Sequence, residues 1–290
     1  MKHSARLVRG LLFLVLFSLA SASSHAERGA PPQPAGPRPK PDTLSASGGD
    51  ITITPIAHAT LQIVHGPNVI LVDPTRYSGY DGVDQPLLLD YKGLKAPTLI
   101  LVTDDHSDHL DQDAIAAMKT PTTKIVVPVA RPQGGPEVEG AIKMSNGETR
   151  TVDGISIEAV PMYNLIRGFK GSPLHPKGHG NGYVVTVGGK RLYIAGDTEC
   201  TSEMKELKNI DVAFLPMNLP YTMTPAEAAA CAMVFKPKTV YPYHYRGQDV
   251  TTFASLLKGS GIEVRLRDWY AGAPPFKFDE SMLPPGVTLR

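Results

Sequence analysis

The chain has 290 residues, and its 29 Lys and Arg nearly balance its 28 Asp and Glu, which gives a net charge of +1. The basic residues form no dense patch that could follow a phosphate backbone, which argues against nucleic acid as a partner. No repeat with a period of tens of residues is found, which argues against a repeat architecture.

Residues 1–26 have the pattern of a secretory signal peptide. Three basic residues precede an almost purely apolar run at 11–20, and Ser24-His25-Ala26 offers small residues at the positions that a signal peptidase reads. The apolar run is shorter than the roughly 20 residues that a membrane-spanning helix needs. We therefore expect cleavage, a periplasmic or secreted product, and no stable membrane anchor after removal of the signal.

A proline-rich segment at 27–48 is predicted to be a linker, because such a composition cannot bury enough apolar surface to offset the cost of ordering. The remaining residues, 49–290, fit one large α/β domain. Removal of 1–26 takes away three basic residues, and 26 basic against 28 acidic residues leave a net charge of −2.

The chain contains two cysteines, Cys200 and Cys231. In an exported protein they could form one disulfide. The alternative, two separate small buried residues, is slightly favoured, since the sequence does not give the distance between them.

The first half of the domain is predicted to be rich in strands. The apolar run at 98–102 is typical of a strand that is buried on both faces. Asp111 is a suitable N-cap for a helix that continues through Met118. Alternation and short apolar runs predict strands at 51–56, 62–64, 69–72, 98–102 and 124–129.

The second half mixes hairpins with helices. Asp153-Gly154 and Gly188-Gly189 suit the positive φ angles of tight turns, and they predict hairpins over 149–160 and 183–195. Between the hairpins lies a Gly- and Pro-rich loop at 167–182, which is long enough to be functional. The elements that follow are predicted as strand 211–215, helix 224–234 with a capping box, strand 239–243, helix 250–257 and strand 261–266.

The strongest chemical signal follows the buried strand at 98–102. Thr103-Asp104-Asp105-His106-Ser107-Asp108-His109 carries four potential metal ligands, and imidazole together with carboxylate suits zinc, manganese or iron. Two further ligand-type residues, Asp197 and His244, also stand directly after predicted strands. Three strand ends with such residues favour a metal site over a charged surface loop.

These motifs resemble the metallo-β-lactamase superfamily. The heptad 103–109 resembles its T-H-x-H-x-D-H signature, and Gly196-Asp197-Thr198 and Pro242-Tyr243-His244-Tyr245 resemble its later ligand motifs, in the same order. Further resemblance to the branch with ascorbate-6-phosphate lactonase-like proteins and the phospholipase D for N-acyl phosphatidylethanolamines lies in the segments 56–60, 71–74, Pro216 and 221–223.

The resemblance implies an αββα sandwich with a two-metal site along one edge. Asp104 and His106 would then hold one metal, and Asp197 would bridge the two. The second metal would be held by Asp108, His109 and His244. Two divalent ions are therefore expected, with zinc as the first choice and manganese as the alternative.

One more ligand to the first metal is expected after strand 155–160. Asn164 stands where many members of the family have His, so His175 or His179 in the following loop could supply the imidazole instead. His175 is favoured, because His-Pro-Lys-Gly before Gly-Tyr resembles a piece of this branch, and His179 would then be a loop or substrate contact.

Asp104 also departs from the family, which usually has His at that position. A carboxylate binds manganese or magnesium more readily than imidazole does, so the departure bears on the identity and occupancy of the first metal.

The resemblance implies a hydrolase that uses a metal-activated water on a small-molecule ester, lactone or phosphodiester. Asp108 would orient the nucleophile. His58, Asn164 and Tyr245 are candidate substrate contacts, with a structural role as the alternative for His58 and Tyr245. The competing hypothesis is a metal- or ligand-binding module of the same fold with lost or weak turnover, and a β-lactam substrate is disfavoured.

Overall fold

The computed structural model describes residues 33–78, 87–129 and 137–273. All of them belong to one compact unit, Pro32–Arg290. The predicted signal peptide at 1–26 lies outside the described residues. Within the described ranges, no helix has both the length and the apolar character needed to cross a bilayer.

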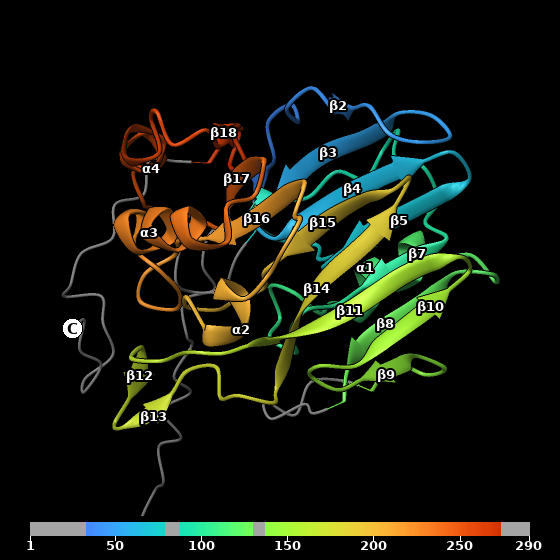
Figure 1. Cartoon of the computed structure of the whole chain (residues 1–290). Helices are drawn as coiled ribbons and strands as arrows, with labels where there is room; N and C mark the ends of the chain where they lie inside the picture. The colour runs from blue at the N-terminus through green and yellow to red at the C-terminus, as the bar shows by residue number, and fades with distance from the viewer. Residues whose placement is uncertain (1–32, 79–86, 130–136, 274–290) are drawn as a thin grey trace, which may run out of the picture. The chain divides into compact units, whose positions relative to one another are not determined.

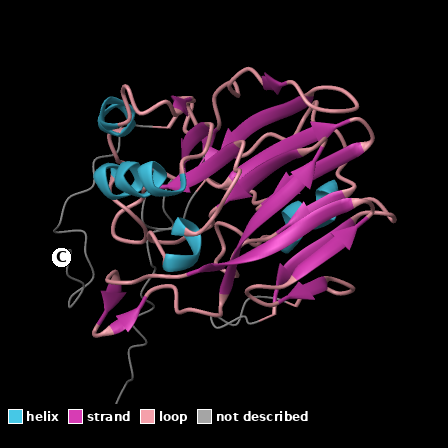
Figure 2. Cartoon of the chain, in the orientation of Figure 1, coloured by secondary structure: helices cyan, strands magenta, loops and turns pink. Residues whose placement is uncertain are grey.

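Two seven-stranded sheets dominate the described part of the chain (Figure 1, Figure 2). The early strands of the first sheet pair antiparallel and the later ones parallel. In order across this sheet, the strands are β2 (Asp42–Leu44), β3 (Ile51–Ala57), β4 (Thr60–His65), β5 (Asn68–Val72), β7 (Leu99–Leu101), β8 (Lys124–Pro128) and β9 (Ile142–Met144).

The second sheet has the same progression from antiparallel to parallel pairing. In order across it, the strands are β10 (Thr149–Val152), β11 (Ile155–Met162), β14 (Gly180–Val187), β15 (Lys190–Ile194), β16 (Val212–Pro216), β17 (Thr239–Tyr243) and β18 (Glu263–Val264).

Two short strand pairs and a few helices complete the described elements. The pairs are β1 (Gln33–Pro34) with β6 (Leu87–Leu88), and β12 (Gly168–Phe169) with β13 (Ser172–Pro173). The helices are α1 (Gln112–Met118), α2 (Ser202–Lys205), α3 (Pro225–Phe235) and α4 (Val250–Leu256).

The elements form four layers, as the αββα resemblance implied. The central hydrophobic core lies between the sheets and takes side chains from both. A second cluster packs α2, α3 and α4 against the outer face of the second sheet, and a third packs α1 against the outer face of the first (Figure 1).

Alternation along the strands builds these layers. In β16, Val212 and Phe214 point into the central core, whereas Ala213 and Leu215 point toward the helices. Because successive side chains of a strand face opposite sides, a wholly apolar strand can serve two cores at once. Each large side chain buried in this way contributes roughly 1.5–3 kcal/mol of hydrophobic stabilisation.

The predicted helix starts and hairpin turns are confirmed. The Asp111 side chain caps α1, and Thr224 and Glu227 form the capping box of α3. Asp153 and Gly154 have φ angles of 47° and 82°, in the positive region that a tight hairpin turn of this type requires.

The first sheet begins earlier in the chain than predicted. Residues 42–44, placed in the linker by composition, form β2 and pair with β3. The strand is short, lies at the edge of the sheet and follows Pro41, and an edge position tolerates a neighbouring proline because one side of the strand needs no ladder bonds. Residues 33–34 of the predicted linker also form β1, which pairs with β6, so the linker prediction for 27–48 does not hold for the part that the structure describes.

The predicted loop at 167–182 needed adjustment, because it contains the β12–β13 hairpin and β14 already begins at Gly180. The short elements β9 and α2 were not predicted, since three or four residues show no periodicity.

Cys200 and Cys231 form a disulfide with a Cα–Cα distance of 5.8 Å, so the separate-residue interpretation of the two cysteines is wrong. The bridge ties the segment after β15 to α3. It thereby fastens the loop that carries Asp197 to the helical layer.

Candidate metal centre

The predicted ligand residues meet at one edge of the two sheets. The segment 103–109 follows β7, Asp197 follows β15, and His244 directly follows β17. β7 pairs in parallel with its neighbours, as β15 and β17 do with β16, so the carboxyl ends of these strands present their loops at the same edge. His58 reaches this edge from the tight turn between β3 and β4.

One group of potential ligands consists of Asp104, His106 and His175, whose ligand-type atoms lie within 4.8 Å of one another. The Asp104 carboxylate hydrogen-bonds His106 Nδ1, and its Oδ2 lies 3.6 Å from His175 Nε2. His106 is the most exposed member of the group, with 18% of its side chain accessible. The structure therefore brings together the three residues favoured for the first metal.

A second group lies beside the first and contains Asp108, His109 and His244. Asp108 Oδ2 is 3.5 Å from His244 Nε2 and 3.9 Å from His109 Nε2. The rings of His109 and His244 are stacked, with centroids 5.1 Å apart. All three side chains are buried.

Asp197 stands between the two groups. Its Oδ2 lies 3.5 Å from His109 Nε2 and 3.6 Å from His175 Nε2, and its Oδ1 lies 3.2 Å from His244 Nε2. A single carboxylate thus faces imidazoles of both groups, which is the position expected for a bridging ligand.

Asp73, at the end of β5, orients His109. The Asp73 carboxylate accepts hydrogen bonds from the backbone N–H and the hydroxyl of Thr103, and it lies 2.9 Å from His109 Nδ1. A carboxylate only accepts hydrogen bonds, so Nδ1 donates to Asp73, and Nε2 is the ring atom that faces the cluster and could present a lone pair to a metal. A metal ligand needs this tautomer.

Asn164 does the same for His175. Its Oδ1 accepts the backbone N–H of His175 at 2.6 Å and lies 2.9 Å from His175 Nδ1, while its Nδ2 donates to the Tyr221 carbonyl. Because both polar atoms of the amide are engaged, Asn164 is better described as a support for His175 than as the expected substrate contact. His179 is not a member of the groups formed by the described residues.

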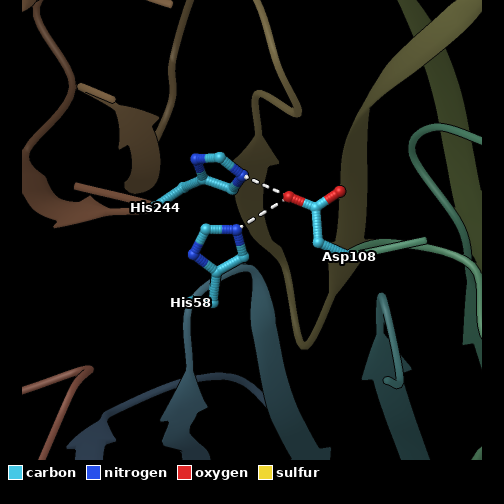
Figure 3. A group of neighbouring side chains, drawn as sticks. All are labelled: His58, Asp108 and His244. Carbon is cyan, nitrogen blue, oxygen red and sulfur yellow. Dashed lines mark hydrogen bonds and ion pairs between the residues drawn. The ribbon is translucent and has the colours of Figure 1, made fainter. Parts of the chain in front are cut away.

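His58 lies directly against the second group (Figure 3). Its Nε2 is 2.9 Å from Asp108 Oδ2, its Nδ1 is 2.6 Å from the Tyr270 hydroxyl, and its ring centroid is 3.7 Å from that of His244. Burial and the nearby His244 lower the pKa of His58 to about 4. With 2% of the residue exposed, His58 is a structural partner of Asp108 and offers little surface to a substrate.

The hydroxyl of Tyr245, the other expected substrate contact, is also engaged within the protein. Its hydroxyl donates to the Arg267 carbonyl at 3.0 Å and accepts the Trp269 backbone N–H at 3.3 Å. These bonds fasten the segment after β18 beside the site. The structural alternative for Tyr245 is therefore the better description.

Two histidines at the site have positive φ angles, which residues other than glycine rarely adopt. His58 and His244 have φ angles of 53° and 47°, and the His244 N–H donates to the His58 carbonyl at 3.0 Å. Left-handed non-glycine residues of this kind each cost of order 1–3 kcal/mol, and they cluster at functional sites. At Gly196 (φ 67°), a Cβ would lie 2.3 Å from Met162 Sδ, so only glycine fits before Asp197.

The buried carboxylates keep their charge because histidines surround them. Burial alone would raise the pKa of Asp108, but His109 and His244 hold it well below its usual value. The pKa of Asp197 is lowered by the same two rings against the effect of burial. Conversely, Asp197 and Asp108 raise the pKa of His109 well above normal, although burial opposes this. The carboxylates and imidazoles at the centre of the cluster thus stabilise one another's charged forms.

Several buried atoms of the site lack a hydrogen-bond partner among the described residues. Unpaired polar atoms are costly in a protein interior, and ligand atoms that face one another are satisfied when they bind a metal. The chemistry of the donor set and these atoms fit divalent metal ions. The atoms are Asp108 Oδ1, His109 Nε2, Asp197 Oδ1, and both ring nitrogens of His244.

Comparison with known proteins agrees with this fold and this donor set. The β-lactamase superfamily domain matches residues 52–244. A UPF0173 metal-dependent hydrolase of Methanopyrus kandleri is 30% identical over 224 residues, which cover 74% of this chain and 94% of that protein. A UPF0173 metal-dependent hydrolase of Pyrobaculum islandicum is 35% identical over 224 residues, which cover 72% of this chain and 93% of that protein.

A solved structure is similar over the same region. The crystal structure of a protein described as a metal-dependent hydrolase from Parabacteroides distasonis is 39% identical, covers 79% of this chain and 98% of its own, and has a TM-score of 0.70. The layered fold and its His/Asp edge are thus those of a metal-dependent hydrolase. The chain belongs to the UPF0173 metal-dependent hydrolases of the metallo-β-lactamase superfamily.

Sequence reasoning missed the orienting role of Asp73 and the presence of Tyr270. Asp73 carries a usable signal, since it follows an apolar strand just as Asp197 does. Tyr270 carries none, because its approach to His58 spans 212 residues of sequence.

We predict that Asp73→Asn weakens metal binding by about 10- to 100-fold, the usual effect of losing an outer partner of a metal-binding His. The amide would place N–H groups where Thr103 and His109 both donate, and so would release the His109 tautomer. Competition titration with a zinc chelator measures the affinity. Asp153→Asn, in an exposed hairpin turn, is the matched control. Unchanged affinity in Asp73→Asn would contradict the orienting role.

Proposed function

We propose that this metal-dependent hydrolase is an exported enzyme that holds two divalent metal ions and cleaves an ester, lactone or phosphodiester of a small molecule. The observation that carries the proposal is the charge buried at the sheet edge. Asp104, Asp108 and Asp197 are each at most 2% exposed, and neighbouring histidines lower the pKa of all three against the effect of burial. Ionised carboxylates buried together are strongly destabilising unless cations compensate them, and divalent ions would supply that compensation.

The residues divide naturally between two ions. Asp104, His106 and His175 would hold the first. The second would be held by Asp108, His109 and His244, and Asp197 would bridge the two. His175 fills the position that Asn164 leaves without an imidazole, so this departure does not by itself argue for a module without turnover.

When bound, such ions supply an activated water and polarise the group under attack. The protein supplies orientation. Asp73 and Asn164 fix the tautomers of His109 and His175, so that both rings present lone pairs. Asp108, near the centre of the cluster, would orient the attacking water. Burial of the second group excludes bulk water, whereas the partly exposed His106 marks the side from which a substrate can approach.

Zinc is the proposed metal, because four imidazoles and three carboxylates form a mixed donor set that suits it. The Asp104 carboxylate makes manganese the alternative, since the first group then contains one imidazole fewer than the usual family pattern.

The substrate class rests on the resemblance to the lactonase-like and phospholipase D-like branch. Esters, lactones and phosphodiesters share the need for a water nucleophile and for stabilisation of charge on the attacked group. Both needs are met by a metal pair, so one site could serve any of the three, and a substrate panel has to separate them.

Export is supported by two features. Residues 1–26 have the composition of a signal peptide. The Cys200–Cys231 bridge adds weight, because disulfides persist in oxidising compartments and are rare in the reducing cytosol. We accordingly propose a periplasmic or secreted enzyme.

We predict that the mature protein hydrolyses at least one of an aryl ester, a γ-lactone and bis(p-nitrophenyl) phosphate. His244→Ala should lower that rate by about a thousandfold or more, since the metals contribute several kcal/mol of transition-state stabilisation. Initial rates with zinc- and manganese-loaded enzyme measure this.

The matched control is His65→Ala, at the other end of β4, where the ring hydrogen-bonds the Ser47 carbonyl at 2.9 Å and lies outside the candidate ligand groups of the described residues. It should keep the wild-type rate. Full activity in a correctly folded His244→Ala protein would overturn the proposed function.

We also predict that expression in an export-competent bacterium yields a mature protein that starts at Glu27 and whose cysteines resist alkylation without reductant. Leu14→Arg interrupts the apolar run and should leave the full-length chain in the cytoplasm. N-terminal sequencing of the fractions checks both. An uncleaved wild-type chain in the cytoplasm, with alkylatable cysteines, would rule out export.

A further inference from the structure

A tyrosine from beyond the matched family region reaches the metal centre. Tyr270 follows β18 and lies outside the matched residues 52–244. It is 8% exposed, and its hydroxyl lies 2.6 Å from His58 Nδ1. A continuous chain of contacts therefore runs from Tyr270 through His58 to Asp108.

The segment around Tyr270 is held firmly in place. Trp269 is fully buried against the rings of Phe214 and Tyr243, and its carbonyl accepts the His58 backbone N–H at 3.4 Å. On its other side, Tyr245 bonds the backbone of 267–269 through its hydroxyl.

The N-terminal segment also contacts this region. The Gly36 N–H donates to the Ala271 carbonyl at 2.6 Å, and a Cβ at Gly272 would lie only 2.7 Å from the Gly36 nitrogen. Two segments on either side of residues 52–244 thus contact each other directly after Tyr270.

The direction of the hydrogen bonds follows from the groups involved. The Tyr270 oxygen accepts the Arg246 backbone N–H at 3.1 Å and lies 2.6 Å from His58 Nδ1, a distance at which its O–H can donate to that nitrogen. Asp108 is a carboxylate and only accepts, so His58 Nε2, at 2.9 Å from it, must carry a proton. His58 Nδ1 is then an acceptor, and the hydrogen bond from Tyr270 satisfies it.

We propose that Tyr270 is a positioning residue that acts through His58 on Asp108. By donating to Nδ1, it holds His58 in the tautomer that donates to Asp108 Oδ2, and this hydrogen bond fixes the carboxylate oxygen that also faces His244 and His109. This inference rests on the proposed function, because it takes Asp108 as a metal ligand.

Tyr270 has a second consequence for the ligand set. His58, Asp108 and His244 place ligand-type atoms within 4.8 Å of one another, so His58 could itself bind a metal if its Nε2 lost the proton. The hydrogen bond from Tyr270 disfavours that tautomer. The tyrosine thereby keeps His58 outside the ligand set and Asp108 within it.

The test compares zinc binding by the mature wild-type chain, Tyr270→Phe and the control Tyr193→Phe, using competition with a chromophoric chelator. The same pair of variants in a His175→Ala background isolates the group around Asp108. Tyr270→Phe should weaken this group's zinc affinity by about 10- to 100-fold in both backgrounds and leave the other binding step unchanged. Tyr193 is a suitable control, since its buried hydroxyl has no hydrogen-bond partner in the described part of the chain.

Nitrogen-15 NMR of the zinc-loaded protein adds a readout that a merely structural role would not move. Wild type should show His58 with a protonated Nε2 and an unprotonated Nδ1, and Tyr270→Phe should lose this single tautomer. The wild-type spectrum alone tests the proposal if the variant does not fold, because a protonated Nδ1 would overturn it.

Three further results would overturn the inference. Two zinc ions bound by Tyr270→Phe with wild-type affinities would refute the inference alone. A parallel weakening of both binding steps, together with a lower unfolding temperature, would reduce Tyr270 to a scaffold residue. A wild-type chain that binds no metal would overturn the proposed function, and the inference with it.

Discussion

The burial of charged carboxylates is the constraint on which the rest of this structure depends. Asp104, Asp108 and Asp197 lie at one sheet edge, where each is nearly inaccessible to water. Histidines offset the cost of this burial in part, as the raised pKa of His109 between Asp197 and Asp108 illustrates, although burial acts against it. The remaining charge is what a pair of divalent cations would balance, so the arrangement is far more favourable with metal bound than without. The charge of the site alone, without reference to a substrate, therefore favours the binding of cations.

Strands, a glycine, the disulfide and hydrogen bonds together position the residues at this edge. The candidate ligands follow the carboxyl ends of parallel strands, and glycine at position 196 allows Asp197 to follow directly on a tightly packed turn. The disulfide fastens the Asp197 loop to α3. Asp73 and Asn164 accept hydrogen bonds from His109 and His175 and so fix the tautomers of these rings. His58 hydrogen-bonds the Asp108 carboxylate and so fixes its orientation. A ligand whose orientation is already fixed loses little freedom on binding, which favours tight metal binding.

The sequence was sufficient to predict which His and Asp residues meet at the sheet edge, because most of them stand directly after apolar strands. It left Asn164, His175 and His179 open for the last position, since only the path of the loop decides which ring faces Asp104. A substrate contact needs a polar atom that has no partner in the protein. For Asn164 and Tyr245 the partners, such as the Tyr221 carbonyl for Asn164, are distant in the sequence and could not be predicted from it. The layers could be predicted from hydrophobic periodicity, and the helix caps from the residues at the helix starts. The edge strand β2 could not be predicted, because the sequence before it is proline-rich and its pairing depends on the neighbouring strand β3.

The most direct test of the account is the metal content of the mature protein, purified after export without added metal, for wild type and Asp104→His. Elemental analysis should give two divalent ions per chain for both proteins, with manganese partly replacing zinc only where the carboxylate is present. One ion in wild type that rises to two in Asp104→His would show that Asp104 has weakened the first group, and it would contradict a native two-metal centre. No bound metal in either protein would contradict the account altogether.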